Sequence, residues 1–228
     1  PLHSCSSMKR IFVTSLCACT LLLLGCGGQR TVSYKLAFVM VDPASQQEVA
    51  LMSMRVIERR LQAMGEMLVD KQINVKNGET TIGITVANKQ VAAALNEQLT
   101  QPFSVQVMRQ VESGADITIE GQGKFKATGI TEKDFSRVDA RQEPNSGQGE
   151  VRLALTPDGH NRMAALFSQA KGSDIGIFVR GKLVSKLHVQ SELLQQDVYI
   201  KNIPDPQLAQ VFADDMNVGL HVTFTPVP

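Results

Sequence analysis

Residues 151–179 read VRLALTPDGHNRMAALFSQAKGSDIGIFV, and this stretch decides the fold class. The apolar run at 151–155 is typical of a strand. Pro157 follows where a helix can begin, because the first helical turn leaves its backbone N–H groups unpaired in any case. The pattern predicts a helix over 157–170 and a second strand over 175–179. A strand, a helix and a second strand in this order are the opening of a ferredoxin-like arrangement and predict an α+β domain.

The segment after this stretch continues the alternation. We expect a tight turn at Arg180-Gly181-Lys182, which leads into a further strand. The other elements expected in this half are strands over 183–189, 198–200 and 220–225 and a helix over 206–216. Together they predict a small ferredoxin-like sandwich of the βαββαβ type.

The first half of the chain carries a similar pattern. Asn77-Gly78 lies between two apolar, β-rich runs and is the strongest short-range signal for a hairpin. The expected elements are strands over 34–41, 72–75, 80–86 and 103–108 and helices over 47–64 and 89–99. This order predicts a second ferredoxin-like βαββαβ sandwich, in which 103–108 is the last strand of the first half.

Between the two halves the composition becomes polar and glycine-rich. We expect a connector over 112–149 that carries one or two short strands, such as 116–120 and 124–128. The expected organisation is an upstream extension and signal peptide over 1–25, a tether over 26–33, a first subdomain over 34–111, the connector, and a second subdomain over 150–228.

The segment from Met8 has the form of a secretory signal, with Lys9 and Arg10 followed by an apolar run from Ile11 to Leu24. This run is too short to cross a bilayer comfortably as a helix. We take Met8 as the start and the preceding PLHSCSS as an upstream extension of the reading frame.

Leu23-Leu24-Gly25-Cys26 resembles the lipobox of bacterial lipoproteins. In that motif the cysteine is acylated, with diacylglycerol and palmitate chains, and becomes the mature N-terminus. We therefore predict Cys26 as the lipid attachment site and the acyl chains as the anchor, since two or three chains bind a membrane stably. Gly27 is not the aspartate that commonly retains lipoproteins at the inner membrane, which favours the outer membrane. Cleavage as a plain secreted protein is the alternative.

Composition and motifs exclude several kinds of chemistry. The full chain has 23 basic and 22 acidic residues, without the basic excess that nucleic-acid binding requires. After removal of the signal, Cys26 is the only cysteine, which leaves no intramolecular disulfide. His160, His188 and His221 lack metal-ligand spacing. We expect no metal, no cofactor and no nucleic-acid partner.

No arrangement of residues in the sequence predicts catalysis. There is no Gly-x-Ser-x-Gly, and Gly121-Gln122-Gly123 has neither the further glycine nor the setting of a phosphate loop. Asp214 and Asp215 point about 100° apart on a helix and are interpreted as a solvated face. Met52, Met54, Met64 and Met67 form either an adaptable surface for peptides or part of the core, and their helical spacing favours the core.

The second half resembles the head of the first periplasmic domain of SecD, a subunit of the bacterial protein-export machinery. Three motifs carry the resemblance: Leu155-Thr-Pro-Asp-Gly159 before a helix, the strand–turn–strand segment Ile175–Ser185, and the helix that ends at Gly219-Leu220. The first half is similar, more loosely, to the base of the same domain through Arg60–Gly65 and Ile82–Val86.

The sequence departs from this family at specific positions. Arg180 stands where the turn usually has Asp, Lys186-Leu187 replaces Ala-Pro, and Asn202 stands where Gly is usual. SecD also carries a bundle of transmembrane helices that conducts protons, and this sequence contains no such bundle. The chain is thus expected to be a free-standing copy of the external domain and not the motor.

The resemblance implies a non-enzymatic envelope protein that faces the periplasm and binds polypeptide or a protein partner in export or envelope biogenesis. We predict that Arg180, Gly181, Lys182, Leu183 and His188 contact this partner. The alternative is an ordinary solvated hairpin tip. Two other functional interpretations remain open, a structural or assembly lipoprotein unrelated to export and a small-ligand binder or hydrolase.

Overall fold

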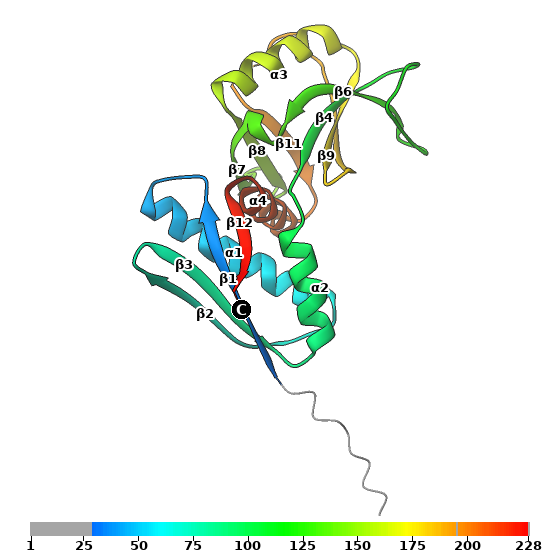
Figure 1. Cartoon of the computed structure of the whole chain (residues 1–228). Helices are drawn as coiled ribbons and strands as arrows, with labels where there is room; N and C mark the ends of the chain where they lie inside the picture. Colours follow the sequence, from blue (N-terminus) through cyan, green and yellow to red (C-terminus); the bar gives the residue numbers. More distant parts are fainter. Residues whose placement is uncertain (1–28, 195, 228) are drawn as a thin grey trace, which may run out of the picture.

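The structure is a computed structural model that describes residues 29–194 and 196–227. It confirms the α+β class: helices pack against antiparallel sheets, which divide the described chain into a lower and an upper body in Figure 1. No helix within these residues is long and apolar enough to cross a membrane. The predicted lipid attachment site, Cys26, and the predicted signal segment lie outside the described residues.

The lower body contains a four-stranded sheet, sheet A, with the order β12-β1-β3-β2. Its strands are β1 (Arg30–Phe38), β2 (Leu68–Lys76), β3 (Glu79–Val86) and β12 (Val222–Val227). Helices α1 (Pro43–Ala63) and α2 (Lys89–Thr100) cover one face, and one apolar core lies between these layers. The predicted hairpin is confirmed, because Asn77 and Gly78 both have positive φ, 54° and 78°, and join β2 to β3.

The upper body contains two sheets. Sheet B has the order β10-β9-β4-β6-β5, and sheet C has the order β11-β8-β7. The strands of sheet B are β4 (Val105–Gln110), β5 (Ile117–Ile119), β6 (Gly123–Thr131), β9 (Asp174–Val179) and β10 (Lys182–His188). Those of sheet C are β7 (Phe135–Gln142), β8 (Gly149–Leu155) and β11 (Val198–Ile203). Helix α3 (Pro157–Ala170) and part of α4 (Pro206–His221) complete the second core.

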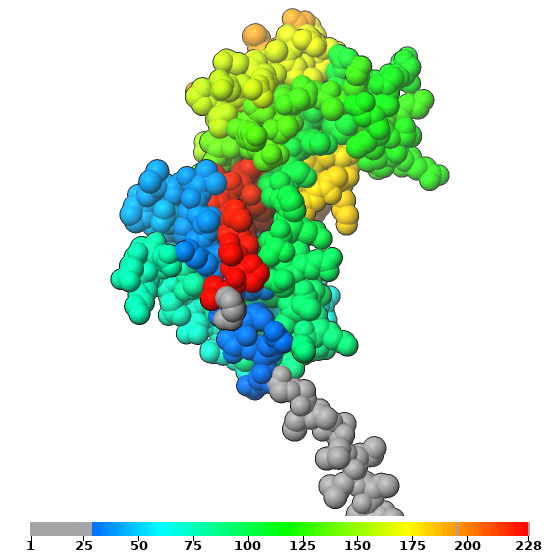
Figure 2. Space-filling view, in the orientation of Figure 1, coloured from blue at the N-terminus to red at the C-terminus, as the bar shows by residue number. Residues whose placement is uncertain are grey.

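The predicted division of strands between two self-contained βαββαβ sandwiches is wrong. The strand expected to complete the first sheet, β4, lies in sheet B, where it pairs with β6 and β9. The last strand of the chain, β12, returns to the lower body and pairs with β1. Figure 2 shows β12, in red, on the surface beside the green α2. Periodicity identifies strands, but it does not identify their partners, which distant segments supply.

Two expected loop segments contain regular structure. The first residues of β1, Arg30–Ser33, were assigned to the tether, yet they pair with β3. The connector contains the whole of β7, which no pattern predicted, and this strand pairs with β8 to form sheet C. Among the elements predicted at nearly the right place, α4 continues to His221 instead of ending at 216.

Helix α4 belongs to both bodies. Ala209, Ala213 and Met216 lie in the core of the upper body, whereas Val218 packs in the core of the lower body. It contacts α1 on one side and β7 and β8 on another. A helix shared in this way fixes how the two bodies sit on each other.

Helix α3 begins at the Leu-Thr-Pro-Asp-Gly motif. Thr156 is its N-cap residue, and the Thr156 hydroxyl accepts a hydrogen bond from the Gly159 N–H at 3.0 Å. Gly159 is buried against the backbone of Asp134, where a Cβ would lie 2.0 Å from the carbonyl oxygen. The motif therefore supplies both a cap and a close approach of two backbones.

Replacing Thr156 by alanine is expected to lower the free energy of unfolding by about 1 kcal/mol, the usual loss when an N-cap hydroxyl is removed. Urea denaturation followed by circular dichroism measures this change. Thr156→Ser keeps the hydroxyl and is expected to retain most of the stability. Equal losses in the two variants would contradict the role of the cap.

Candidate protein-binding surface

The residues predicted to bind a partner lie on the β9–β10 hairpin and along β10. Arg180 and Gly181 form its two-residue turn, with φ of 49° and 74°. Positive φ at both central residues is typical of hairpin turns that match the twist of the strands. Arg180 and Asn202, with φ of 60°, are two of the positions where this sequence departs from the SecD pattern, and both adopt the left-handed conformation.

Arg180 is held against the segment that joins the two bodies. The Arg180 N–H donates to the Ser104 carbonyl at 2.9 Å, and its guanidinium carbon lies 5.7 Å from the centre of the Phe103 ring. Phe103 in turn lies against Gly219 of α4, where a Cβ would come within 2.2 Å of the ring. Arg180 therefore positions the hairpin in addition to any contact with a partner.

The next residues differ in exposure. Gly181 and Lys182 are exposed at the hairpin tip, whereas Leu183 is half-buried against a small cluster of Met108, Phe125 and Phe178. A bulge at Val184 shifts the register between Leu183 and Ser185, and the Val184 side chain is 45% exposed. The bulge leaves an apolar side chain accessible on this strand.

The far end of β10 carries an ion-paired cluster. Asp174 on β9 accepts from Lys186 at 3.0 Å and contacts His188 Nδ1 at 2.7 Å. The hydrogen bond with His188 and the bonds and charge of Lys186 keep the pKa of Asp174 below its ordinary value. Lys186 also donates to the Gln122 carbonyl at 3.2 Å, which ties β10 to the β5–β6 turn.

The structure thus places the five predicted residues on one strand and its turn but does not gather them into one site. Arg180 and His188 lie at opposite ends of β10, each with partners of its own. Their common property is the edge position. Within residues 29–194 and 196–227, no strand pairs with the outer side of β10. An edge strand offers unpaired backbone N–H and C=O groups to an extended chain.

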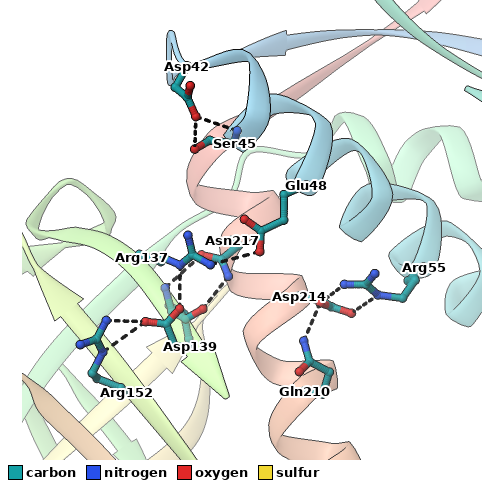
Figure 3. A network of polar contacts seen from close by, with 11 residues as sticks. Asp42, Ser45, Glu48, Arg55, Arg137, Asp139, Arg152, Gln210, Asp214 and Asn217 are labelled. Atoms are coloured by element: carbon teal, nitrogen blue, oxygen red, sulfur yellow. Dashed lines mark hydrogen bonds and ion pairs between the residues drawn. The ribbon is translucent and has the colours of Figure 1, made fainter. Parts of the chain in front are cut away.

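No pattern in the sequence predicted the polar network on α4. Asp214, interpreted as a solvated residue, has a fully buried side chain. The guanidinium of Arg55 holds it with two hydrogen bonds, from Nε to Oδ2 at 2.9 Å and from Nη2 to Oδ1 at 2.7 Å. Arg59 and Gln210 each donate to it at 3.0 Å. Figure 3 shows that Arg55 reaches Asp214 across the gap between α1 and α4.

A second part of this network joins α4 to sheet C. Asn217 accepts from the Val138 N–H at 3.0 Å and donates to the Val138 carbonyl at 2.6 Å. Nearby, Arg137 reaches Glu48 of α1 at 3.1 Å and Asp139 at 2.6 Å (Figure 3). The two bodies are therefore joined by directional polar contacts as well as by apolar packing.

Asp215 differs from its neighbour. Its side chain is about half exposed, at 48%, and it lies 3.6 Å from Arg59 Nη2. Partial desolvation raises the pKa of Asp215. Burial also acts to raise the pKa of Asp214, but the hydrogen bonds that its carboxylate accepts outweigh burial, and its pKa is lowered. The spacing of Arg55 and Arg59, four residues apart on one face of α1, is the sequence signal that was available for an acidic partner.

The methionines near α1 divide between core and surface. Met52 and Met54 are buried in the core of the lower body, as the helical spacing favoured, and Met64 packs partly against it. Met67 lies beyond the helix and is 82% exposed. These residues therefore form no continuous surface for peptides.

No protein-family model matches this chain, and neither does any curated protein. Solved structures of SecDF are similar to it at 14% sequence identity. One, described as a membrane component that enhances protein export, aligns with a TM-score of 0.47 over 86% of this chain and 98% of that chain.

Two further SecDF structures align with a TM-score of 0.49. They are SecDF in a super-membrane-facing form, matched over 88% of this chain, and SecDF from Thermus thermophilus, described as a translocon-associated membrane protein, matched over 86%. This chain spans 30% of the length of each of these two chains.

Proposed function

We propose that this protein is a non-enzymatic, lipid-anchored protein of the bacterial envelope that binds extended polypeptide or a protein partner in protein export or envelope biogenesis. The lipobox-like segment that ends at Cys26 supports the anchor. The SecD-like motifs of the second half support the link to export, since they follow one another in the order typical of that family.

The observation that carries the proposal is the open edge of β10. A segment of polypeptide that lies beside β10 would extend sheet B by one strand and satisfy the backbone groups of both strands. Backbone pairing of this kind does not depend on one sequence, which suits a protein that handles varied chains. Val184 and Lys182 would contact alternate side chains of the bound segment.

The charges along β10 favour an anionic partner near the hairpin tip. Asp174 neutralises Lys186 at the far end of the strand, whereas Lys182 forms no ion pair among the described residues. Arg180 adds a second positive charge at the turn. An exposed charge of this kind contributes more to the rate and the salt dependence of association than to affinity.

Charge reversal at the tip tests this surface. Lys182→Glu is expected to weaken binding of a reduced, carboxymethylated and permanently unfolded polypeptide by roughly threefold, because an exposed ion pair contributes up to about 1 kcal/mol. The effect should fade at high salt. Fluorescence anisotropy of the labelled polypeptide measures both.

Lys76→Glu on β2 is the matched control, since Lys76 is also an exposed lysine on an edge strand. It is expected to leave binding unchanged. Equal affinity for wild type and Lys182→Glu at low salt would exclude the tip from the binding surface. An equal loss in both variants would show that only net charge matters.

A further inference from the structure

A cavity of about 310 Å³ opens in the lower body, away from β10. It lies between α2 and the adjacent strands β1 and β12 of sheet A. Its walls are largely small or apolar, and its lining includes Arg30, Val32, Tyr34, Lys89, Ala93 and Val227. Its volume falls at the lower end of the range for sites that bind small organic molecules.

Tyr34 lines this cavity and is buried, with only 1% of its surface exposed. Its ring packs edge-on against Phe224, with the ring centres 6.0 Å apart. The hydroxyl is buried and has no hydrogen-bond partner among the described residues. Burial raises the pKa of Tyr34 to about 12, so the hydroxyl keeps its proton at neutral pH and is a donor without an acceptor.

Two exposed cations, Arg30 and Lys89, line the same cavity. Arg30 begins β1, and Lys89 lies in the first turn of α2, near the positive end of the helix dipole. Among residues 29–194 and 196–227, neither forms an ion pair and no carboxylate side chain lines the cavity. A buried residue with an unpartnered donor and two exposed cations in one cavity lining favour a ligand that carries negative charge and accepts hydrogen bonds.

We propose that this cavity binds an anionic amphiphile, a carboxylate or phosphate monoester on a short hydrocarbon body. The hydrocarbon packs against the small and apolar side chains of α2, β1 and β12. The charged head lies at Arg30 and Lys89, and an oxygen of the ligand accepts from the Tyr34 hydroxyl. This site is independent of polypeptide binding at β10.

The probes are decanoate and decyl phosphate, each below its micellar concentration, and decanol below its solubility limit. The chain has no Trp and only two Tyr, so Tyr34 is the only tyrosine left in the Tyr199→Phe variant. The tyrosine emission of this variant therefore comes from Tyr34 alone. Saturable changes in Tyr34 emission with either anion, and weaker binding of decanol, are expected. Comparison of the two anions identifies the preferred head group. No binding of either anion, or equal binding of decanol, would overturn the proposal.

Tyr34→Phe separates a ligand site from a packing defect. In the absence of ligand this variant is expected to be at least as stable as wild type, because it removes a buried hydroxyl that has no partner. Its affinity for the preferred anion, measured by calorimetry, should fall roughly fivefold, the contribution of one hydrogen bond. Unchanged affinity would show that Tyr34 takes no part.

Two further variants test the rim and the walls. Arg30→Ala combined with Lys89→Ala is expected to reduce affinity at least tenfold, whereas Lys76→Ala, at an exposed site on β2, should not change it.

Ala93→Trp introduces a bulky side chain at an exposed position of α2 that lines the cavity, and it should abolish binding while the far-ultraviolet circular dichroism stays unchanged. Retained binding in a folded Ala93→Trp protein would place the ligand elsewhere.

Discussion

Asp214→Ala is expected to lower the free energy of unfolding by about 3 kcal/mol, the largest effect among the proposed substitutions. The variant removes the buried carboxylate that Arg55 and Arg59 share, so the N–H groups that donate to Asp214 lose this acceptor. Removal of one partner from a hydrogen-bonded ion pair costs most where the remaining charge is shielded from water, which here applies to Arg59, whose side chain is 27% exposed. Chemical denaturation at neutral pH measures this loss.

The same network makes stability depend on pH. The pKa of Asp214 is lower in the folded protein than in the unfolded chain, because its hydrogen bonds outweigh the effect of burial. The carboxylate therefore contributes stability at neutral pH, and this contribution is lost as the pH falls below about 4 and through the folded pKa. The difference in stability between wild type and Asp214→Ala should shrink over this acidic range.

Asp215→Asn is the matched control on the adjacent residue. Its pKa is raised in the folded state, so the ionised form of Asp215 costs stability once the pH exceeds the ordinary value. At neutral pH this substitution is expected to leave stability unchanged or slightly increased. Equal losses in Asp214→Ala and Asp215→Asn would contradict the assignment of the buried network to Asp214.

Gly159→Ala is expected to destabilise the protein by about 2 kcal/mol. A Cβ at this position would lie 2.0 Å from the Asp134 carbonyl oxygen, and a backbone atom cannot rotate away as a side chain can. Overpacking of this kind lowers the free energy of unfolding by up to about 3 kcal/mol. The better helix propensity of alanine offsets up to about 1 kcal/mol of this loss. Thermal unfolding followed by circular dichroism measures the net change.

Asn161→Ala, two residues further along α3, is the control for helix propensity. Asn161 is exposed, so alanine there is expected to be neutral or slightly stabilising. A Gly159→Ala protein as stable as wild type would show that α3 can shift away from Asp134. The close approach of the two backbones would then no longer explain the glycine of the Leu-Thr-Pro-Asp-Gly motif.

The sequence predicted individual elements better than their partners. Helix α3 and the Asn77-Gly78 hairpin were predicted at their observed positions, because caps, turns and periodicity are local signals. Strands β4 and β12 were recognised but assigned to the wrong sheets, because each pairs with strands that lie far away in the sequence. Strand β7 was missed because charged residues interrupt its alternation.

The candidate site shows the same limit. The hairpin at Arg180 follows from local residues, and the edge position of β10 follows only from the topology. The burial of Asp214 depends on α1, whose Arg55 lies 159 residues away in the sequence. Adjacent aspartates on an amphipathic helix look alike in sequence, and only the packing of α4 between the two bodies distinguishes them.

Extended polypeptide is expected to bind along the open edge of β10. Photo-crosslinking in living cells from an unnatural amino acid at position 184 tests it most directly, because Val184 is exposed on that edge strand, whereas Leu183 faces a core cluster. Position 75, an exposed valine on the edge strand β2, is the matched control. We expect exported polypeptides or export subunits in the adducts from 184 and not from 75. Identical adducts from both positions, or one unrelated envelope protein from 184, would contradict binding of exported polypeptide along β10.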